Sequence, residues 1–416
     1  MIMAICSSSD RGSHVDKTEH NSREGGARSA AFRRALAARL KGFSAEISAE
    51  AEKTPVRPYR PDRALFPVPE LVLFALREGM GWRWYGHGEK VLWTVRGTID
   101  GQRVAFERQK FGFTIFLPKD RADLKARVEG QLRAALGEVE TYLSEFAEAQ
   151  VEAGEVVIAN HFSEFEDRYR FHRELADAAH RFKLEPHDDI VGAQGDAATH
   201  SGFISRDITQ RMNRMATVQR EAFFHSTAMI DAYFSCLEHR LILLRAFTGR
   251  PFGPGEVLKL LKMRWGDKLK DVLGLPYSTE AAIIIRRMRR IKERIRNPFS
   301  HGGVENDKGS IHFHLPKIGM IPANFTRFGD SIRFSVIPVG ADDHAGVCET
   351  FDALDALLST GALASPHEFV RWGVDPNFDA AHSAEYAEAI AEGPEVVDAF
   401  IEAWSRRWEN FQNMDF

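Results

Sequence analysis

The stretch 279–303 limits the fold more than any other, because a strict helical period meets an abrupt end there. Four apolar residues at helical spacing predict a face packed on a core: Ile284, Met288, Ile291 and Ile295. Six cations crowd residues 286–294, relieved there only by Glu293: Arg286, Arg287, Arg289, Arg290, Lys292 and Arg294. Pro298 lacks an amide donor, and two glycines follow it. We therefore expect a basic amphipathic helix that stops just beyond Arg296.

Residues 296–301, Arg-Asn-Pro-Phe-Ser-His, resemble the R-N-x-x-x-H signature of the HEPN superfamily, helical domains that include many metal-independent endoribonucleases. Arg220 and His225 repeat the Arg-to-His spacing inside an apparently continuous helix. Residues five apart in an unbroken helix point about 140° away from each other, so that pair should diverge. Arg296 and His301 flank a proline break, where the chain can bring them together.

The resemblance implies RNA cleavage in which the substrate supplies its own nucleophile, the 2′-hydroxyl. His301 can transfer protons, since an unperturbed imidazole titrates near pH ~6.5. Arg296 can bind two phosphate oxygens through its planar guanidinium, and Asn297 is suited to fixing the turn after the helix. The six cations named above would bind the RNA backbone without sequence choice. The expected products carry 2′,3′-cyclic phosphate or 3′-phosphate ends, and we expect no cofactor and no metal.

A long helix is predicted from Asp207, as its cap, to about Phe247, with Asp231, Ser235 and Glu238 in one polar line. This line is either a solvated flank or the source of a carboxylate that orients Arg296. In some HEPN ribonucleases, acidic or polar residues on the early helices do the latter, so Asp231 and Glu238 are candidate supporting residues.

Two other functions stay open. A non-catalytic HEPN module could bind RNA, a nucleotide or a partner protein. A structural dimerisation protein could pair its basic helix with an acidic partner. Many HEPN proteins are toxins or antiviral defence effectors, which implies a regulatory or antitoxin partner, and HEPN domains commonly form homodimers that join two sites in one cleft.

Composition limits the partners and the compartment. The net charge of -4 over 416 residues excludes a uniformly basic coat, so RNA would have to meet a local patch. The 3 cysteines lie far apart and suit a reducing cytoplasm. No apolar run is long enough for a bilayer, so no membrane contact is expected. His161, His172 and His180 lack the spacing of a helical His pair backed by a carboxylate, so no metal site is predicted.

The expected fold is mainly α and α+β overall. Residues 1–60 should be a disordered, basic tail with a short amphipathic helix, and a proline-rich linker at 54–68 should precede an α+β domain at 65–185. Alternation on both sides of a turn at Asp100-Gly101 predicts a three-stranded antiparallel meander in that domain. Residues 204–416 should form a HEPN-like antiparallel helical bundle, with a β-hairpin from 311–315 and 332–336 inserted in it. A capping box at Ser365 should start a further helix, and Gly393-Pro394 should kink or break the last helix, from about Ala384 to Phe411.

Overall fold

The computed structural model describes residues 21–119, 121–182, 197–274, 276–297, 312–322 and 339–413. Side chains are not described at 21–28, 122, 197–208, 294, 312–313 and 320–322. The described chain forms two compact units. An N-terminal unit extends to Ala153 and includes the residues from Glu402 onward, and a helical unit extends from Gly154 to Ile401.

The N-terminal unit is built on a six-stranded sheet of order β1-β4-β5-β6-β2, with β3 also paired to β4. Its centre is the predicted antiparallel meander of β4 (Val91–Ile99), β5 (Gln102–Gln109) and β6 (Gly112–Pro118). Asp100 and Gly101 both have positive φ, 50° and 74°, as a two-residue hairpin turn requires. The remaining strands are short: β1 (Phe43–Ser44), β2 (Val56–Tyr59) and β3 (Trp84–Tyr85).

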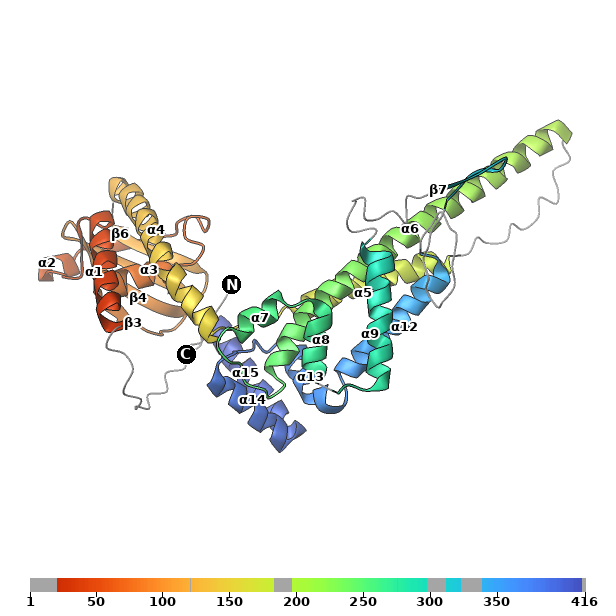
Figure 1. Cartoon of the computed structure of the whole chain (residues 1–416). Helices are drawn as coiled ribbons and strands as arrows, with labels where there is room; N and C mark the ends of the chain where they lie inside the picture. The colour runs from red at the N-terminus through yellow and green to blue at the C-terminus, as the bar shows by residue number, and fades with distance from the viewer. Residues whose placement is uncertain are drawn as a thin grey trace. The chain divides into compact units, whose positions relative to one another are not determined.

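Helices pack on this sheet and close its core (Figure 1). They are α1 (Asn21–Arg39), α2 (Ala49–Glu52), α3 (Glu70–Phe74), the π-helix η1 (Ala75–Gly79) and α4 (Ala122–Ala153). The Phe32 ring of α1 stacks on Tyr142 of α4 at 4.2 Å between centroids. Leu36, Val72 and Val128, from three helices, share one buried core with the strand residues Phe106 and Ile115.

The predicted tail and linker are corrected by this arrangement. Residues 29–60 belong to the N-terminal unit, because α1 packs on α4 and two short strands of this segment join the sheet. Strand β2, which contains Pro58, lies inside the proline-rich stretch and pairs with β6. A proline is tolerated there because β2 is an edge strand. The prolines mark a sheet edge, and the domain boundary lies at Gly154 instead.

The helical unit contains most of the remaining helices, and α15 crosses the division between the units after Ile401. Their bounds are α5 (Phe162–Arg181), α6 (Ala197–Ala246), α7 (Glu256–Lys262), α8 (Trp265–Leu273), α9 (Thr279–Ile291), η2 (Lys292–Arg296), α12 (Ala341–Leu358), η4 (Gly361–Leu363), α13 (Ala364–Arg371), α14 (Ala380–Glu392) and α15 (Pro394–Asn413). A hairpin joins β7 (His312–Leu315) to β8 (Gly319–Pro322). Within the described ranges, no helix is long and apolar enough to cross a membrane.

Helix α6 is the axis of this unit, with α5, α9 and α12 alongside it in Figure 1. Tyr233 of α6 meets Tyr169 of α5 edge-on at 5.0 Å and stacks on Phe351 of α12 at 3.7 Å. His180, which follows Tyr169 in α5, lies within hydrogen-bond distance of Ser226, which precedes Tyr233 in α6. The later part of α5 therefore lies beside the earlier part of α6, so the two helices run antiparallel. The helix α5 therefore belongs with α6, and the predicted domain limit of 185 is wrong.

Helix α9 confirms the predicted amphipathic pattern. Ser278 caps it by accepting a hydrogen bond from the Ala281 amide at 3.1 Å. All four residues of the apolar stripe are buried, as are Ala281 and Ile285. The predicted proline and glycine stop lies outside the described residues.

Several boundaries differ from the predicted ones. Helix α6 begins at Ala197 rather than after Asp207, because extending an existing helix costs far less than starting one. The first hairpin strand pairs with Gly319–Pro322, while 332–336 lies outside the described residues. Helix α12 was not predicted, and α13 begins at Ala364 without a side-chain cap. Gly393, at φ 114°, separates α14 from α15 as expected.

Candidate functional site

The end of the basic helix is joined to α6 by an ion pair. Arg296 Nε donates to Asp231 Oδ1 at 2.8 Å, and its guanidinium carbon lies 5.2 Å from the centroid of the Phe234 ring. The Arg296 side chain is 24% exposed and that of Asp231 45% exposed. The expected contact between Asp231 and Arg296 is thus present, and solvent still reaches the guanidinium.

A local widening of the helix precedes this contact. After Ile291 the backbone forms the π-helix η2, in which the Asn297 amide donates to the Lys292 carbonyl five residues earlier. A π-turn holds one more residue than an α-turn, and such turns are frequent at functional sites. Ile295 stays buried in the core while Arg296, beside it, faces Asp231.

Glu238, the second carboxylate proposed to orient Arg296, acts on two lysines instead. Among the described residues it forms no ion pair with Arg296. Burial lowers the pKa of both Lys268 and Lys292, and the Glu238 carboxylate partly offsets that effect on each. The positive charge of Arg296 also lowers the pKa of Lys292, because the two cations lie close enough to repel each other. Of the two candidate carboxylates, Asp231 is the one that holds Arg296 directly.

A groove of about 570 Å³ lies between the start of α8 and the basic helix. It is lined by Arg264, Trp265, Gly266, Asp267, Arg289, Lys292, Glu293 and Asn297. The Lys292 ammonium lies 5.9 Å from the centroid of the Trp265 ring. The volume falls within the range of about 300–1,000 Å³ usual for ligand pockets. Cations outnumber carboxylates in the lining, so the groove suits an anionic ligand.

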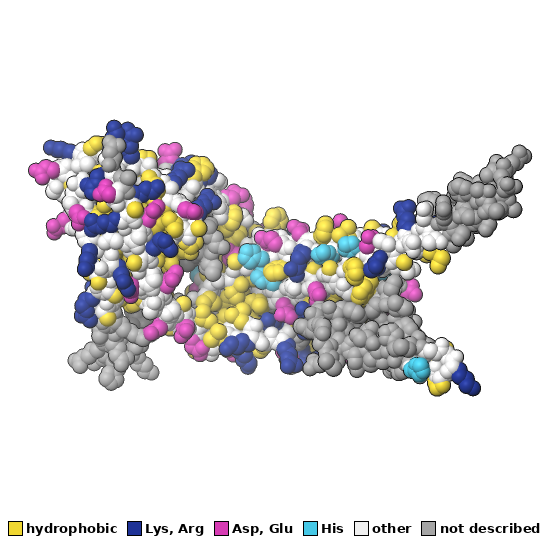
Figure 2. Space-filling model, turned by 90° about the horizontal axis from the view of Figure 1, so that it is seen from above, with side chains coloured by type: hydrophobic (Ala, Val, Ile, Leu, Met, Phe, Trp, Pro, Cys, Tyr) yellow, Lys and Arg dark blue, Asp and Glu magenta, His cyan; other side chains and the backbone are white. Residues whose placement is uncertain are grey.

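The other predicted site residues divide by exposure. Arg286, Arg287 and Arg289 are exposed, whereas Arg290 and Lys292 are half-buried. The side chain of Arg294 and the whole of His301 lie outside the described residues. On the N-terminal unit, Lys and Arg side chains are interspersed with Asp and Glu on the face seen in Figure 2. Among the described residues of the helical unit, the exposed arginines of α9 form a local basic patch.

The second Arg-to-His pair lies in the unbroken helix α6, where Arg220 is exposed and His225 half-buried. Because the helix is continuous there, the two side chains point in different directions, as expected.

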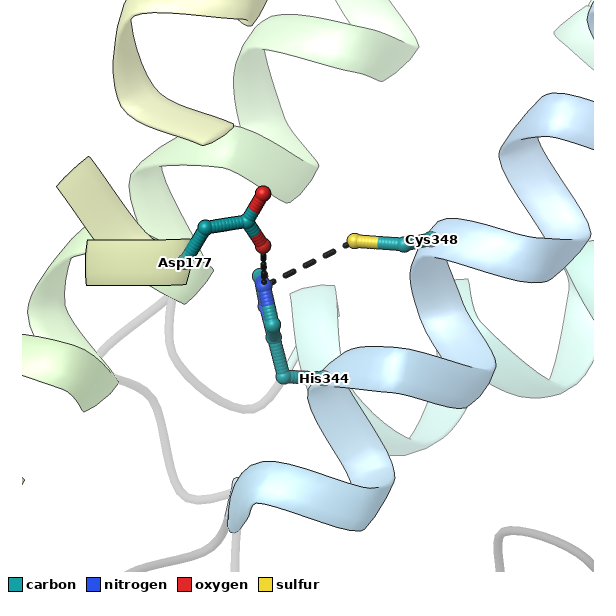
Figure 3. A group of neighbouring side chains, drawn as sticks. All are labelled: Asp177, His344 and Cys348. Carbon is teal, nitrogen blue, oxygen red and sulfur yellow. Dashed lines mark hydrogen bonds and ion pairs between the residues drawn. The ribbon is translucent and has the colours of Figure 1, made fainter. Parts of the chain in front are cut away.

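A separate polar cluster connects α5 with α12, and the sequence did not predict it. His344 Nε2 lies 2.7 Å from Asp177 Oδ1 and 3.6 Å from Cys348 Sγ. Figure 3 shows the three side chains converging on one point. On the far side of the imidazole, His344 Nδ1 lies 3.2 Å from Ser226 Oγ, which lies 2.9 Å from His180 Nε2.

Burial governs the chemistry of this cluster. His344 and Cys348 are 4% and 7% exposed, while the Asp177 side chain is 37% exposed. Burial raises the pKa of the Cys348 thiol to about 11, against the weaker effect of Arg173. Burial, together with His344, lowers the pKa of His180 to about 4. His180 is therefore neutral near pH 7.

One part of this cluster was visible in the sequence. His344 and Cys348 are four residues apart, the spacing that places two side chains on one helix face. The carboxylate lies 167 residues before His344, so no local spacing rule includes it. The prediction against a metal site compared histidines with histidines and cysteines with cysteines, so it did not pair His344 with Cys348.

No protein-family model, curated protein or solved structure matches this chain, so proposals about its function rest on its own residues.

Proposed function

We propose that the helical unit is a metal-independent endoribonuclease of the HEPN type. The observation that carries the proposal is the Arg296–Asp231 ion pair at the end of a basic helix, beside a groove lined partly by Asn297. A carboxylate that fixes an arginine by its Nε orients the second fork of the guanidinium, formed by Nη1 and Nη2. That fork matches two oxygens of one phosphate.

The neighbouring groups support RNA as the substrate. Exposed arginines on α9 supply positive charge along the approach to Arg296, which favours a polyanion irrespective of its sequence. The Trp265 ring is buried in the groove wall beneath the Lys292 ammonium, and Lys292 and Arg264 can meet phosphates from the groove. The groove joins these contacts to Asn297, one residue from Arg296.

The reaction needs proton transfer and charge stabilisation but no added nucleophile. A base takes the proton of the 2′-hydroxyl, the 2′-oxygen bonds to phosphorus, and the bond to the 5′-oxygen breaks as that oxygen receives a proton. Arg296 would balance the charge that develops on the non-bridging oxygens. His301 is assigned the proton transfers on the motif alone, because it lies outside the described residues.

The test compares purified full-length protein with its Arg296→Ala and His301→Ala variants on total cellular RNA. Each variant should lose at least about 100-fold in cleavage rate, the usual contribution of a positioned proton donor or charge stabiliser. Arg220→Ala and His225→Ala are the matched controls, since they remove the same residue types from an unbroken helix, and both should cleave at the wild-type rate.

End-labelling of the products completes the test. We expect 2′,3′-cyclic phosphate or 3′-phosphate ends without added Mg²⁺. Equal cleavage by wild-type and both site variants, or products with 5′-phosphate and 3′-hydroxyl ends, would overturn the assignment. RNA binding that resists both substitutions without any cleavage would favour a non-catalytic module.

A further inference from the structure

We infer that Asp177, His344 and Cys348 bind Zn²⁺ and so connect α5 to α12 in the helical unit. The three donor atoms lie within 4.8 Å of one another. A carboxylate, an imidazole and a thiol are each common zinc ligands. This site is distinct from the residues proposed for RNA cleavage.

Two of the three donor separations are close to those around a tetrahedral ion. With bonds of about 2.0 to 2.3 Å, a nitrogen and a sulfur ligand lie about 3.6 Å apart, and a nitrogen and an oxygen about 3.3 Å. The distance from Cys348 Sγ to His344 Nε2 is already 3.6 Å. The Asp177 oxygen, at 2.7 Å from Nε2, has to move out by roughly 0.6 Å. Asp177 is the most exposed of the three and can make that movement by a side-chain rotation.

The surroundings of His344 set which nitrogen faces the ion. Ser226 Oγ lies 3.2 Å from His344 Nδ1 and 2.9 Å from His180 Nε2, so its hydroxyl can donate a hydrogen bond to the His180 nitrogen. Ser226 then accepts a hydrogen bond from Nδ1–H of His344. That tautomer leaves the Nε2 lone pair directed at Asp177 and Cys348. Support of a ligand imidazole through its other nitrogen is typical of zinc sites.

The same geometry argues against a Cys-His-Asp nucleophilic triad. In such a triad the carboxylate and the nucleophile contact opposite nitrogens of the imidazole. Here Asp177 and Cys348 approach the same nitrogen, Nε2. A cation at their meeting point satisfies all three donors, and its two positive charges balance one thiolate and one carboxylate. Three protein ligands leave the fourth position of a tetrahedral ion for water.

The experiment uses full-length protein freed of metal by dialysis against a chelator. Titration with Zn²⁺ in competition with a chromophoric chelator should give one tight site per chain, and Co²⁺ should produce a near-ultraviolet thiolate-to-cobalt absorption band. Cys348→Ser should abolish that band and weaken Zn²⁺ binding by about 100-fold or more. Cys236→Ser is the matched control, because it removes the other described buried cysteine, and it should bind as wild type does.

Asp177→Asn provides a variant at a half-exposed position, which keeps the test valid if Cys348→Ser does not fold. It should also weaken binding while leaving the helical circular dichroism unchanged. Zn²⁺ at about 100 times its Kd should raise the Tm of the wild-type helical unit by roughly 5 to 10 °C, and that of Asp177→Asn by less. Absence of the cobalt band in wild type, or unchanged Zn²⁺ affinity in both variants, would overturn the inference. Binding in Arg296→Ala should equal wild type, which separates this result from that of the nuclease assay.

Discussion

Replacement of Asp231 by Asn isolates the step on which the proposed function depends most, the orientation of Arg296. Asparagine keeps the size of the side chain and can still accept a hydrogen bond, so the change removes charge. The ion pair is 2.8 Å long, but Asp231 is 45% exposed, and partly solvated pairs contribute only about 0.2–1 kcal/mol. For a unit of this size, the Tm should fall by at most about 4 °C.

The effect on cleavage should be larger than the effect on stability. The Arg296 guanidinium, freed of its charged partner, loses the orientation that the ion pair imposes, and a displacement near 1 Å costs about 100-fold in rate. We expect Asp231→Asn to cleave RNA about 10- to 100-fold more slowly, a change of about 1.4–2.7 kcal/mol in the activation free energy. Single-turnover cleavage of an end-labelled RNA measures this rate, and thermal unfolding of the same samples measures the stability.

Glu238→Gln is the matched control, because it makes the same change of charge on the same helix without an ion pair to Arg296. Its cleavage rate should stay within about 3-fold of wild type, as expected for a charge that acts only at a distance through water. In the double variant Asp231→Asn/Arg296→Ala, the rate should equal that of Arg296→Ala alone, since both changes remove one interaction. A wild-type rate in Asp231→Asn, or an equal loss in Glu238→Gln, would refute the orienting role.

Two further predictions concern assembly and pH. If two protomers complete one cleft, excess His301→Ala protein mixed with wild type should suppress cleavage more steeply than dilution does, and sedimentation should show a dimer at micromolar concentration; a fully active monomer would contradict this. Burial lowers the pKa of His239 and of His367 to about 4, so both are neutral when folded and take up protons more readily when unfolded. Stability should therefore fall as the pH decreases from about 6.5 to about 4, and the denaturant midpoint of His239→Gln should fall less steeply over that range.

Features set by local interactions were predictable from the sequence, whereas features set by long-range contacts were not. The apolar stripe of α9 and the turn at Asp100-Gly101 were predictable, since helical periodicity and the preference of glycine for positive φ are local properties. The role of Pro58 was not, because the same residue fits a linker or an edge strand, and only the pairing of β2 with β6 distinguishes them.

The candidate site shows the same contrast. The sequence alone placed Arg296 and Asn297 at the end of a basic helix and proposed a carboxylate of the preceding long helix as support. The choice of Asp231 over Glu238 needed the π-turn of η2 and the packing of that turn on α6, 65 residues away in the chain. The function of His301 remains a prediction from the motif.

By itself, then, the sequence determined the helices and strands with strong periodicity, the cationic character of α9 and the net charge that excludes a uniformly basic coat. Only the tertiary structure decided that α5 packs with α6, that the units divide at Gly154, and that Asp177 meets His344 and Cys348. Periodicity tells which face of a helix is buried but not which other helix covers that face. That partner is selected by the fit of side chains across the core, a property of the whole fold that no local stretch of sequence contains.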